Sequence, residues 1–449
     1  MDKLRNIKSE SKLRRVLSID YIGNLFLLLY IFSMPFVSAF AFTPIISCSL
    51  IFAVFLFLIM AIKFLQSLKL PYGLIGIDIV IVFLLLFLIS FSFAINGWGN
   101  SKSFNHTIAY LSTFLLFYIS VKFILFNAKD KNKIFKRVLK AITYITLISA
   151  IYANVEFIVC NVFDINLNDY IPRPTEAEAF YNAIVLGEFY RARGFAPESG
   201  HFAFMMELFG PLTIYYIYFS GFCRWKKPLK ALIITVIILS IIFTVSTASF
   251  IIIPLAVLFA LLFYLKSICI YLKKNTAKFV LSTATVSVVV LLFNYYLSFY
   301  AFIILSISQK MDSGSFEDRK SRINFFYDNF FGQDLIHKLV GIGPAGYNIL
   351  GFDESNAILS LYYSITFELG FIGLFLFLLF FLYIFYHAIK IKSTIRFFLL
   401  IAITSGIMHY NFISNFWYPW FWFVAAFVIF CSKQNSVLFN NYKADNISH

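Results

Sequence analysis

The chain has 449 residues, of which 61% are hydrophobic and 13% charged, and its formal net charge is +15. Soluble domains carry about 25% charged residues, so the composition excludes an ordinary soluble protein. The positive charge does not indicate nucleic-acid binding, because Lys and Arg crowd short loops between apolar stretches, which is how membrane proteins set their orientation. We expect the lipid bilayer, and no nucleic acid, as a partner.

Apolar stretches of about 20 residues, the length that crosses a bilayer as a helix, recur along the chain. Backbone groups in lipid must bond within their own segment, so we predict an all-α membrane helix bundle with about twelve transmembrane helices in one domain, residues 1–449. The predicted spans are 21–40, 44–62, 74–95, 104–126, 138–162, 201–221, 230–247, 249–265, 279–301, 370–389, 397–412 and 416–432.

Basic loops follow every second span, at 63–69, 129–140, 224–230, 266–278 and 390–396. This alternation predicts that the N-terminus, 1–20, and the C-terminus, 433–449, are cytoplasmic. The basic N-terminus runs into the first span without a small-residue cleavage site, which indicates a retained anchor. The two long polar loops, about 164–200 and 303–356, then lie on the periplasmic side.

The first long loop ends in a run that carries Arg191, Arg193, Glu198 and His201. The two arginines are either solvated charges or bidentate phosphate ligands. Pro and Glu suit the first turn of a helix, so Glu198 is either a helix-start residue or a carboxylate that faces a substrate. Helical spacing puts Glu198 and His201 on one face, where the pair could move a proton.

The second long loop carries Arg319 and Arg322, followed by a glycine cluster with Gly341 and Gly343. Arginines on two loops that can fold over one cavity favour anion binding more than a single cluster does. The glycines predict a turn whose backbone approaches a ligand closely, and they match neither a P-loop nor a dinucleotide fingerprint.

The end of the second loop predicts a helix N-terminus at 353–356 and an amphipathic or membrane-surface helix over 356–369. Gly370 allows a bend into the tenth span. The aromatic run 417–422 fits an interfacial belt, with a sugar platform as the alternative.

Ionisable residues inside spans are costly and functional by default. Asp78 lies near a predicted cytoplasmic end and is either interfacial or functional. Glu207 lies two turns below Glu198 and can line the same cavity, and His409 either joins it or bonds a neighbouring helix. The five cysteines show no metal-binding spacing, so we expect no metal.

Three segments resemble the bacterial superfamily of O-antigen polymerases and O-antigen ligases, which are lipid-to-lipid glycosyltransferases. The segments are the run 191–203, Arg322 followed by Gly341-Ile-Gly343-Pro344, and Asn356 followed by Glu368-Leu-Gly370. Ligases usually have a His before the Asn, and Ser355 stands there, which favours a polymerase. His201 and His337 are alternative proton acceptors.

The resemblance implies a GT-C-like fold in the bacterial inner (cytoplasmic) membrane, with a periplasmic active site. It implies an enzyme without metal or cofactor that transfers a growing glycan from undecaprenyl diphosphate to the non-reducing end of an incoming undecaprenyl-diphosphate-linked repeat unit. Glu198, His201 and Arg322 would be catalytic. The diphosphate ligands would be Arg191, Arg193, Arg319 and Arg322, and the supporting residues Gly341, Gly343, Asn356 and Glu368.

Two other functions stay open at this point. An O-antigen ligase, which joins glycan to lipid A-core, uses the same leaving group. A flippase for the lipid-linked oligosaccharide suits twelve spans, but it would need cations in mid-span, where charges are scarce. A chain-length regulator is an expected further partner of a polymerase.

Overall fold

The computed structural model describes residues 19–43, 46–68, 70–71, 73–174, 184–185, 189–265, 308, 314–352 and 358–439. These residues form a helical protein, with strands only in a two-residue antiparallel pair, β1 (Ile184–Val185) and β2 (Phe189–Tyr190). Six helices are long and apolar enough to cross a membrane. They are Cys48–Ser67, Ile77–Gly97, Ser101–Asn127, Lys131–Val162, Ser199–Phe219 and Leu361–Lys390.

The elements follow one another with short connections. The first part of the chain forms α2 (Ile19–Ser33), α3 (Cys48–Ser67), α4 (Ile77–Ser92), η1 (Phe93–Gly97), α5 (Ser101–Ser112), η2 (Thr113–Ile119), α6 (Ser120–Asn127), α7 (Lys131–Val162) and η3 (Leu167–Tyr170). The rest forms α9 (Ser199–Ile214), η4 (Tyr215–Phe219), α10 (Lys227–Ile242), α11 (Thr247–Leu262), α15 (Gly314–Phe330), α16 (Leu335–Val340), α17 (Gly346–Ile349), α18 (Leu361–Lys390), α19 (Ile395–His409), α20 (Pro419–Lys433) and α21 (Asn435–Phe439).

Each predicted span except the ninth coincides with a helix, and the ninth, 279–301, lies outside the described residues. Some boundaries were wrong. The first span ends at Ser33 rather than at residue 40, because Pro35 disfavours helix at the residue before it. The fifth begins early, at Lys131, because the Asp130 side chain caps it by accepting the Lys133 N–H.

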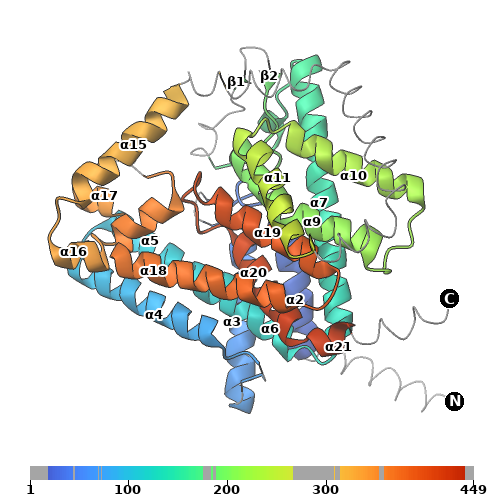
Figure 1. Ribbon diagram of the computed structural model, residues 1–449, viewed down its shortest axis with the longest axis horizontal. Helices are drawn as coiled ribbons and strands as arrows, with labels where there is room; N and C mark the ends of the chain where they lie inside the picture. The colour runs from blue at the N-terminus through green and yellow to red at the C-terminus, as the bar shows by residue number, and fades with distance from the viewer. Residues whose placement is uncertain are drawn as a thin grey trace.

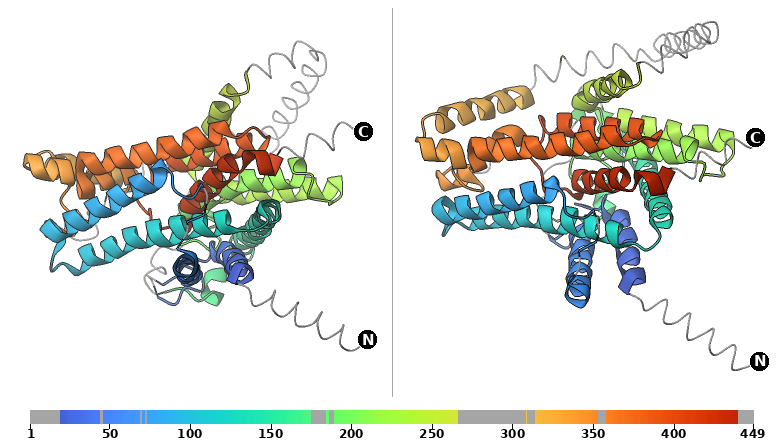
Figure 2. Two further views of the ribbon diagram at one scale, coloured as in Figure 1. Left: turned by 90° about the horizontal axis from the view of Figure 1, so that it is seen from below. Right: turned by 60° about the horizontal axis from the view of Figure 1, so that its bottom comes forward.

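The helix α18, α4 and the run from α5 to α6 lie side by side, as the views of Figures 1 and 2 agree. The helix α20 lies at the centre of the bundle, and residues 419–431 are buried on every side. The interfacial-belt prediction is therefore wrong for Trp420 and Trp422, whose indoles donate to carbonyls of Met34 and Phe416 inside the core. Only Trp417 of the three is partly exposed.

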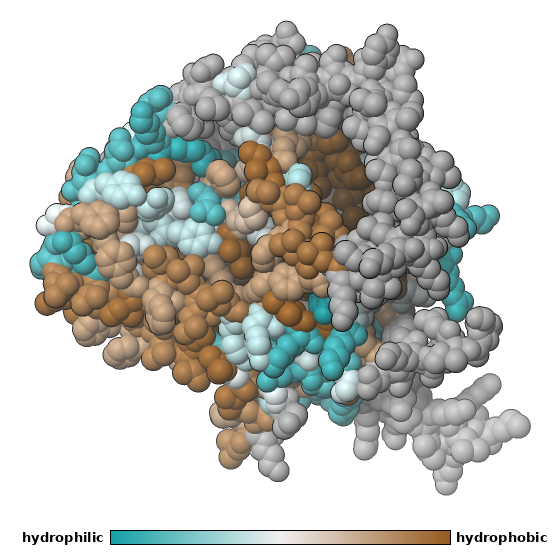
Figure 3. Space-filling model, in the orientation of Figure 1, coloured by the Kyte–Doolittle hydropathy of each residue, from teal (hydrophilic) through white to brown (hydrophobic). Residues whose placement is uncertain are grey.

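The outer helices expose apolar rather than polar side chains. On α4 the exposed stripe is Val80, Phe83, Phe87 and Phe91, at the three- and four-residue spacing of one helix face, and Phe87 is 69% exposed. Figure 3 shows this face as a continuous hydrophobic band below the hydrophilic surface of α15. Such a surface is unstable in water and fits lipid.

A buried charge pair joins α4 to α6. The carboxylate of Asp78 is fully buried and accepts from the Lys122 ammonium and from the Tyr118 hydroxyl. An unpaired charge there would cost several kcal/mol, so the partners explain how the carboxylate is tolerated. The prediction that Asp78 is merely interfacial was wrong.

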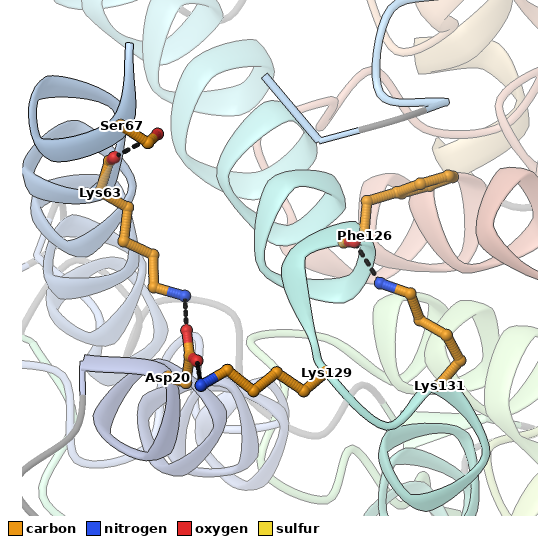
Figure 4. A network of polar contacts seen from close by, with 6 residues as sticks. All are labelled: Asp20, Lys63, Ser67, Phe126, Lys129 and Lys131. Atoms are coloured by element: carbon orange, nitrogen blue, oxygen red, sulfur yellow. Dashed lines mark hydrogen bonds and ion pairs between the residues drawn. The ribbon is translucent and has the colours of Figure 1, made fainter. Parts of the chain in front are cut away.

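The predicted basic loops meet at one place. Figure 4 shows Asp20 of α2 between Lys63 and Lys129, which come from the loops predicted at 63–69 and 129–140. Lys131 donates to the Phe126 carbonyl beside them. Segments predicted to share one side therefore share one end of the bundle.

Candidate functional site

Two glycines allow a loop to enter the bundle. Gly370 breaks α18 with a φ of +67°, and Gly341 has a φ of +82°. The break frees the carbonyls of Phe367 and Glu368, which accept the N–H groups of Ile342 and Gly343 at 2.9 and 3.0 Å. A Cβ on Gly341 would lie 2.1 Å from the Glu368 carbonyl oxygen, so only glycine fits there.

This arrangement decides several predictions for the second loop. The bend at Gly370 is confirmed. The membrane-surface helix predicted over 356–369 was wrong, because the helix begins at Leu361 and residues 365–370 are buried against the loop. Asn356 and the predicted helix start at 353–356 lie outside the described residues.

The side chain of Glu368 is buried below this loop. Its Oε2 accepts the Tyr110 hydroxyl at 2.8 Å, and its Oε1 lies 3.2 Å from Nδ1 of His106. Tyr110 also stacks on Phe416, with ring centroids 3.8 Å apart. Glu368 thus joins α18 to α5 and to the connection between α19 and α20.

The arginine run of the first loop is held by a carboxylate from α7. Glu156 accepts the backbone N–H groups of Arg193 and Gly194 at 2.9 and 2.7 Å. Arg193 is only 1% exposed, and its guanidinium donates to the Pro197 carbonyl. Arg173 fixes the other side of the run by donating to the carbonyls of Gly194 and Ala196. Arg193 therefore faces the inside of its own loop.

Arg191 and Arg319, one from each long loop, lie within electrostatic reach of each other and of Glu198. Arg191 donates through Nε to the Thr244 carbonyl at 2.8 Å, and Arg319 through Nη1 to the Phe412 carbonyl at 2.9 Å. Burial lowers the pKa of Arg191 to about 10, with Glu198 opposing and Arg319 adding to the shift. Burial likewise lowers the pKa of Arg319, against the effect of Glu198.

The Glu198 carboxylate is exposed, and it does not cap its helix. The residue occupies the N-cap position of α9, but its side chain makes no capping hydrogen bond. Its strongest described neighbours are the two guanidinium groups. Of the two interpretations of this residue, the geometry favours a carboxylate that belongs to the cationic group.

The remaining candidates are already engaged in contacts. Arg322 pairs with Asp318 one turn away, its Nε 2.9 Å from each carboxylate oxygen. His337 pairs in the same way with Asp334 on exposed α16. His201 is 5% exposed, and its Nε2 lies 3.1 Å from the Asn415 side-chain oxygen.

Deeper in the bundle, Glu207 and His409 form a buried pair with a separation of 2.9 Å. The pair joins α9 to α19. Of the two alternatives for His409, the structure therefore shows the bond to a neighbouring helix.

One segment, 412–418 between α19 and α20, contacts all these groups. Its Phe412 carbonyl holds Arg319, its Asn415 contacts His201, and its Trp417 ring lies 5.7 Å from that of His106. Sequence reasoning did not single out His106, Tyr110 or the anchoring role of Arg173. The only signal for His106 was an ionisable residue inside a predicted span.

The chain matches no protein-family model and no curated protein. No group of three or more His, Cys, Asp and Glu side chains that could hold a metal ion occurs in the described part of the chain. The fold and the site define a helical membrane protein in which two arginine-bearing loops meet beside an exposed carboxylate.

Proposed function

We propose that this chain is an O-antigen polymerase. It transfers a growing glycan from undecaprenyl diphosphate to an incoming undecaprenyl-diphosphate-linked repeat unit. The observation that carries the proposal is the meeting of Arg191 and Arg319, from two loops far apart in sequence, in a protein with a lipid-facing surface. A lipid-linked diphosphate is a ligand that needs both features.

The two arginines suit a diphosphate leaving group. Among the described residues, each guanidinium makes one printed hydrogen bond to a backbone carbonyl, so most of its five N–H donors are left for a ligand. Guanidinium groups bind phosphate in bidentate fashion and stabilise the charge that develops as the diphosphate leaves. Arg322 adds charge beside Arg319, while Arg193 shapes the loop. Glu198 orients the two cations.

We place the protein in the inner membrane with both termini cytoplasmic and the arginines at the periplasmic face. The meeting of Lys63 and Lys129 at Asp20 supports this orientation, because basic loops gather on the cytoplasmic side. A GT-C-like bundle of about twelve spans is part of the same proposal.

The test is complementation of a deletion strain, read as the surface lipopolysaccharide ladder on a gel. A deletion that leaves core plus a single repeat supports a polymerase. Bare core with long glycan on the carrier lipid would indicate a ligase, and bare core with single repeats trapped at the cytoplasmic face a flippase. An unchanged ladder would remove the protein from the pathway.

In the same strain, we expect Arg319→Ala to leave single repeats, because the leaving diphosphate loses a preformed donor. Loss of one such donor costs about 100-fold or more in rate. Arg319→Lys keeps the charge but not the fork and should give short chains. Lys320→Ala, at an exposed position on the same helix, is the matched control and should restore the full ladder. A full ladder from Arg319→Ala at normal membrane levels contradicts the proposed role.

A further inference from the structure

A histidine and a glutamate from different helices form a pair that the arginine loops do not explain. The Glu368 side chain is 2% exposed and that of His106 is 23% exposed, with Nδ1 and Oε1 3.2 Å apart. The Tyr110 hydroxyl occupies the other carboxylate oxygen. The carboxylate is thus inside the protein while the imidazole reaches its surface.

This geometry is suited to proton transfer. A carboxylate beside Nδ1 favours the tautomer with its proton on that nitrogen, so Nε2 is the basic nitrogen. The same carboxylate stabilises the imidazolium that forms when Nε2 takes a proton. The histidine–carboxylate pairs elsewhere in the site differ, because Glu207 and His409 are both buried and His337 and Asp334 lie on exposed α16.

An aromatic surface lies beside the pair. The Trp417 and His106 rings are 5.7 Å apart, and Trp417 is only partly buried, unlike Trp420 and Trp422. The C–H face of a sugar ring packs on such a surface through dispersion. A sugar hydroxyl at its edge would meet the imidazole.

The pair shares its support with the arginines. Arg319 is bonded to the Phe412 carbonyl, and His106 contacts Phe416 and Trp417 four and five residues further along the same segment. Glycosyl transfer requires the acceptor hydroxyl and the leaving diphosphate in one geometry, and a common rigid segment supplies that.

We propose that Trp417 and the His106–Glu368 pair form the acceptor-sugar subsite, with His106 as the general base. The inference rests on the proposed function. Nε2 of His106 takes the proton of the acceptor hydroxyl, and the hydroxyl oxygen bonds to the anomeric carbon of the glycan. The bond from that carbon to the diphosphate oxygen breaks, and its electron pair leaves with undecaprenyl diphosphate.

The other candidate bases fit this step less well. Nε2 of His201 faces the Asn415 side chain, and the ring is buried. Glu198 faces two guanidinium groups, which stabilise its ionised form and make it a weak base.

The test uses the full chain in proteoliposomes with lipid-linked repeat units extracted from a strain of the source bacterium that lacks the protein. We expect His106→Ala to lower kcat by about 100- to 10,000-fold with little change in KM. Added imidazole should restore part of the rate, which a structural defect would not allow. Trp417→Ala should raise KM, and Trp417→Phe should keep it near the wild-type value.

The variants His201→Ala and His337→Ala serve as rivals under the same protocol. Rescue by imidazole in either of them, and not in His106→Ala, would assign the base elsewhere. A His106→Ala rate within about threefold of wild type overturns the inference, as does an unrescued loss in a variant that melts like wild type. Wild-type protein that fails to elongate the units overturns the proposed function itself.

Discussion

Several single residues in this site hold backbone rather than ligand. The Glu156 carboxylate accepts two N–H groups of the arginine run, and Arg173 binds two of its carbonyls. Buried backbone groups without partners cost about 1–3 kcal/mol each, so these two side chains fix the path of a loop that has no regular structure. Arg191 is presented at the surface because its neighbours are anchored in this way.

The charge state of Arg191 gives a prediction at this scale. Its pKa is about 10, so the guanidinium is charged at neutral pH and loses its proton as the pH rises through that value. Diphosphate affinity should therefore fall above about pH 10. Glu198 raises the pKa of both Arg191 and Arg319, so Glu198→Gln should move this loss to lower pH.

The measurement is the binding of pyrophosphate to the purified protein between neutral pH and pH 10.5, followed by tryptophan fluorescence. Glu317→Gln, at an exposed position on α15, is the matched control and should leave the midpoint unchanged. An equal midpoint in Glu198→Gln and wild type would mean that this carboxylate does not act on the arginines.

Among the elements, the broken helix α18 decides how deeply the second loop enters the bundle. Gly341→Ala would meet both an unfavourable φ and the Glu368 carbonyl, whereas Gly351→Ala meets only the φ of +85°, with no atom within 4 Å. Residual strain at such a φ costs about 1–3 kcal/mol. We expect Gly341→Ala to lower the melting temperature clearly more than Gly351→Ala, and to abolish polymerisation by displacing Glu368. Equal effects of the two changes on melting would show that the loop does not depend on this close approach.

The sequence predicts the elements better than the contacts between them. Hydropathy identifies the helices, and glycine placement identifies the bend at Gly370, because both depend on local chemistry. The pairing of Glu368 with His106 joins residues that no periodicity relates, so sequence reasoning assigned Glu368 a supporting role and gave His106 none. The aromatic run misled for a similar reason, since an indole at a bilayer interface and one in a core have the same local sequence.

For the whole molecule, the unresolved question of function is one of sides. The site groups gather around segment 412–418 and the 341–343 turn, whereas Lys63 and Lys129 meet at Asp20. A polymerase of lipid-linked sugars requires the first group on the periplasmic face. The positive-inside tendency requires the second on the cytoplasmic face, so one orientation satisfies both.

Cysteine labelling measures this orientation directly. In a background without the five native cysteines, we expect Lys320→Cys to react with a membrane-impermeant maleimide in cells whose outer membrane alone is permeabilised. Lys129→Cys, whose native side chain is 83% exposed, should react only after the inner membrane is opened. Because both positions are exposed, a difference in labelling reports the side and not burial. The reverse pattern would place the arginines in the cytoplasm, where a periplasmic polymerase could not use them, and labelling of both sites from one side would break the predicted alternation of loops.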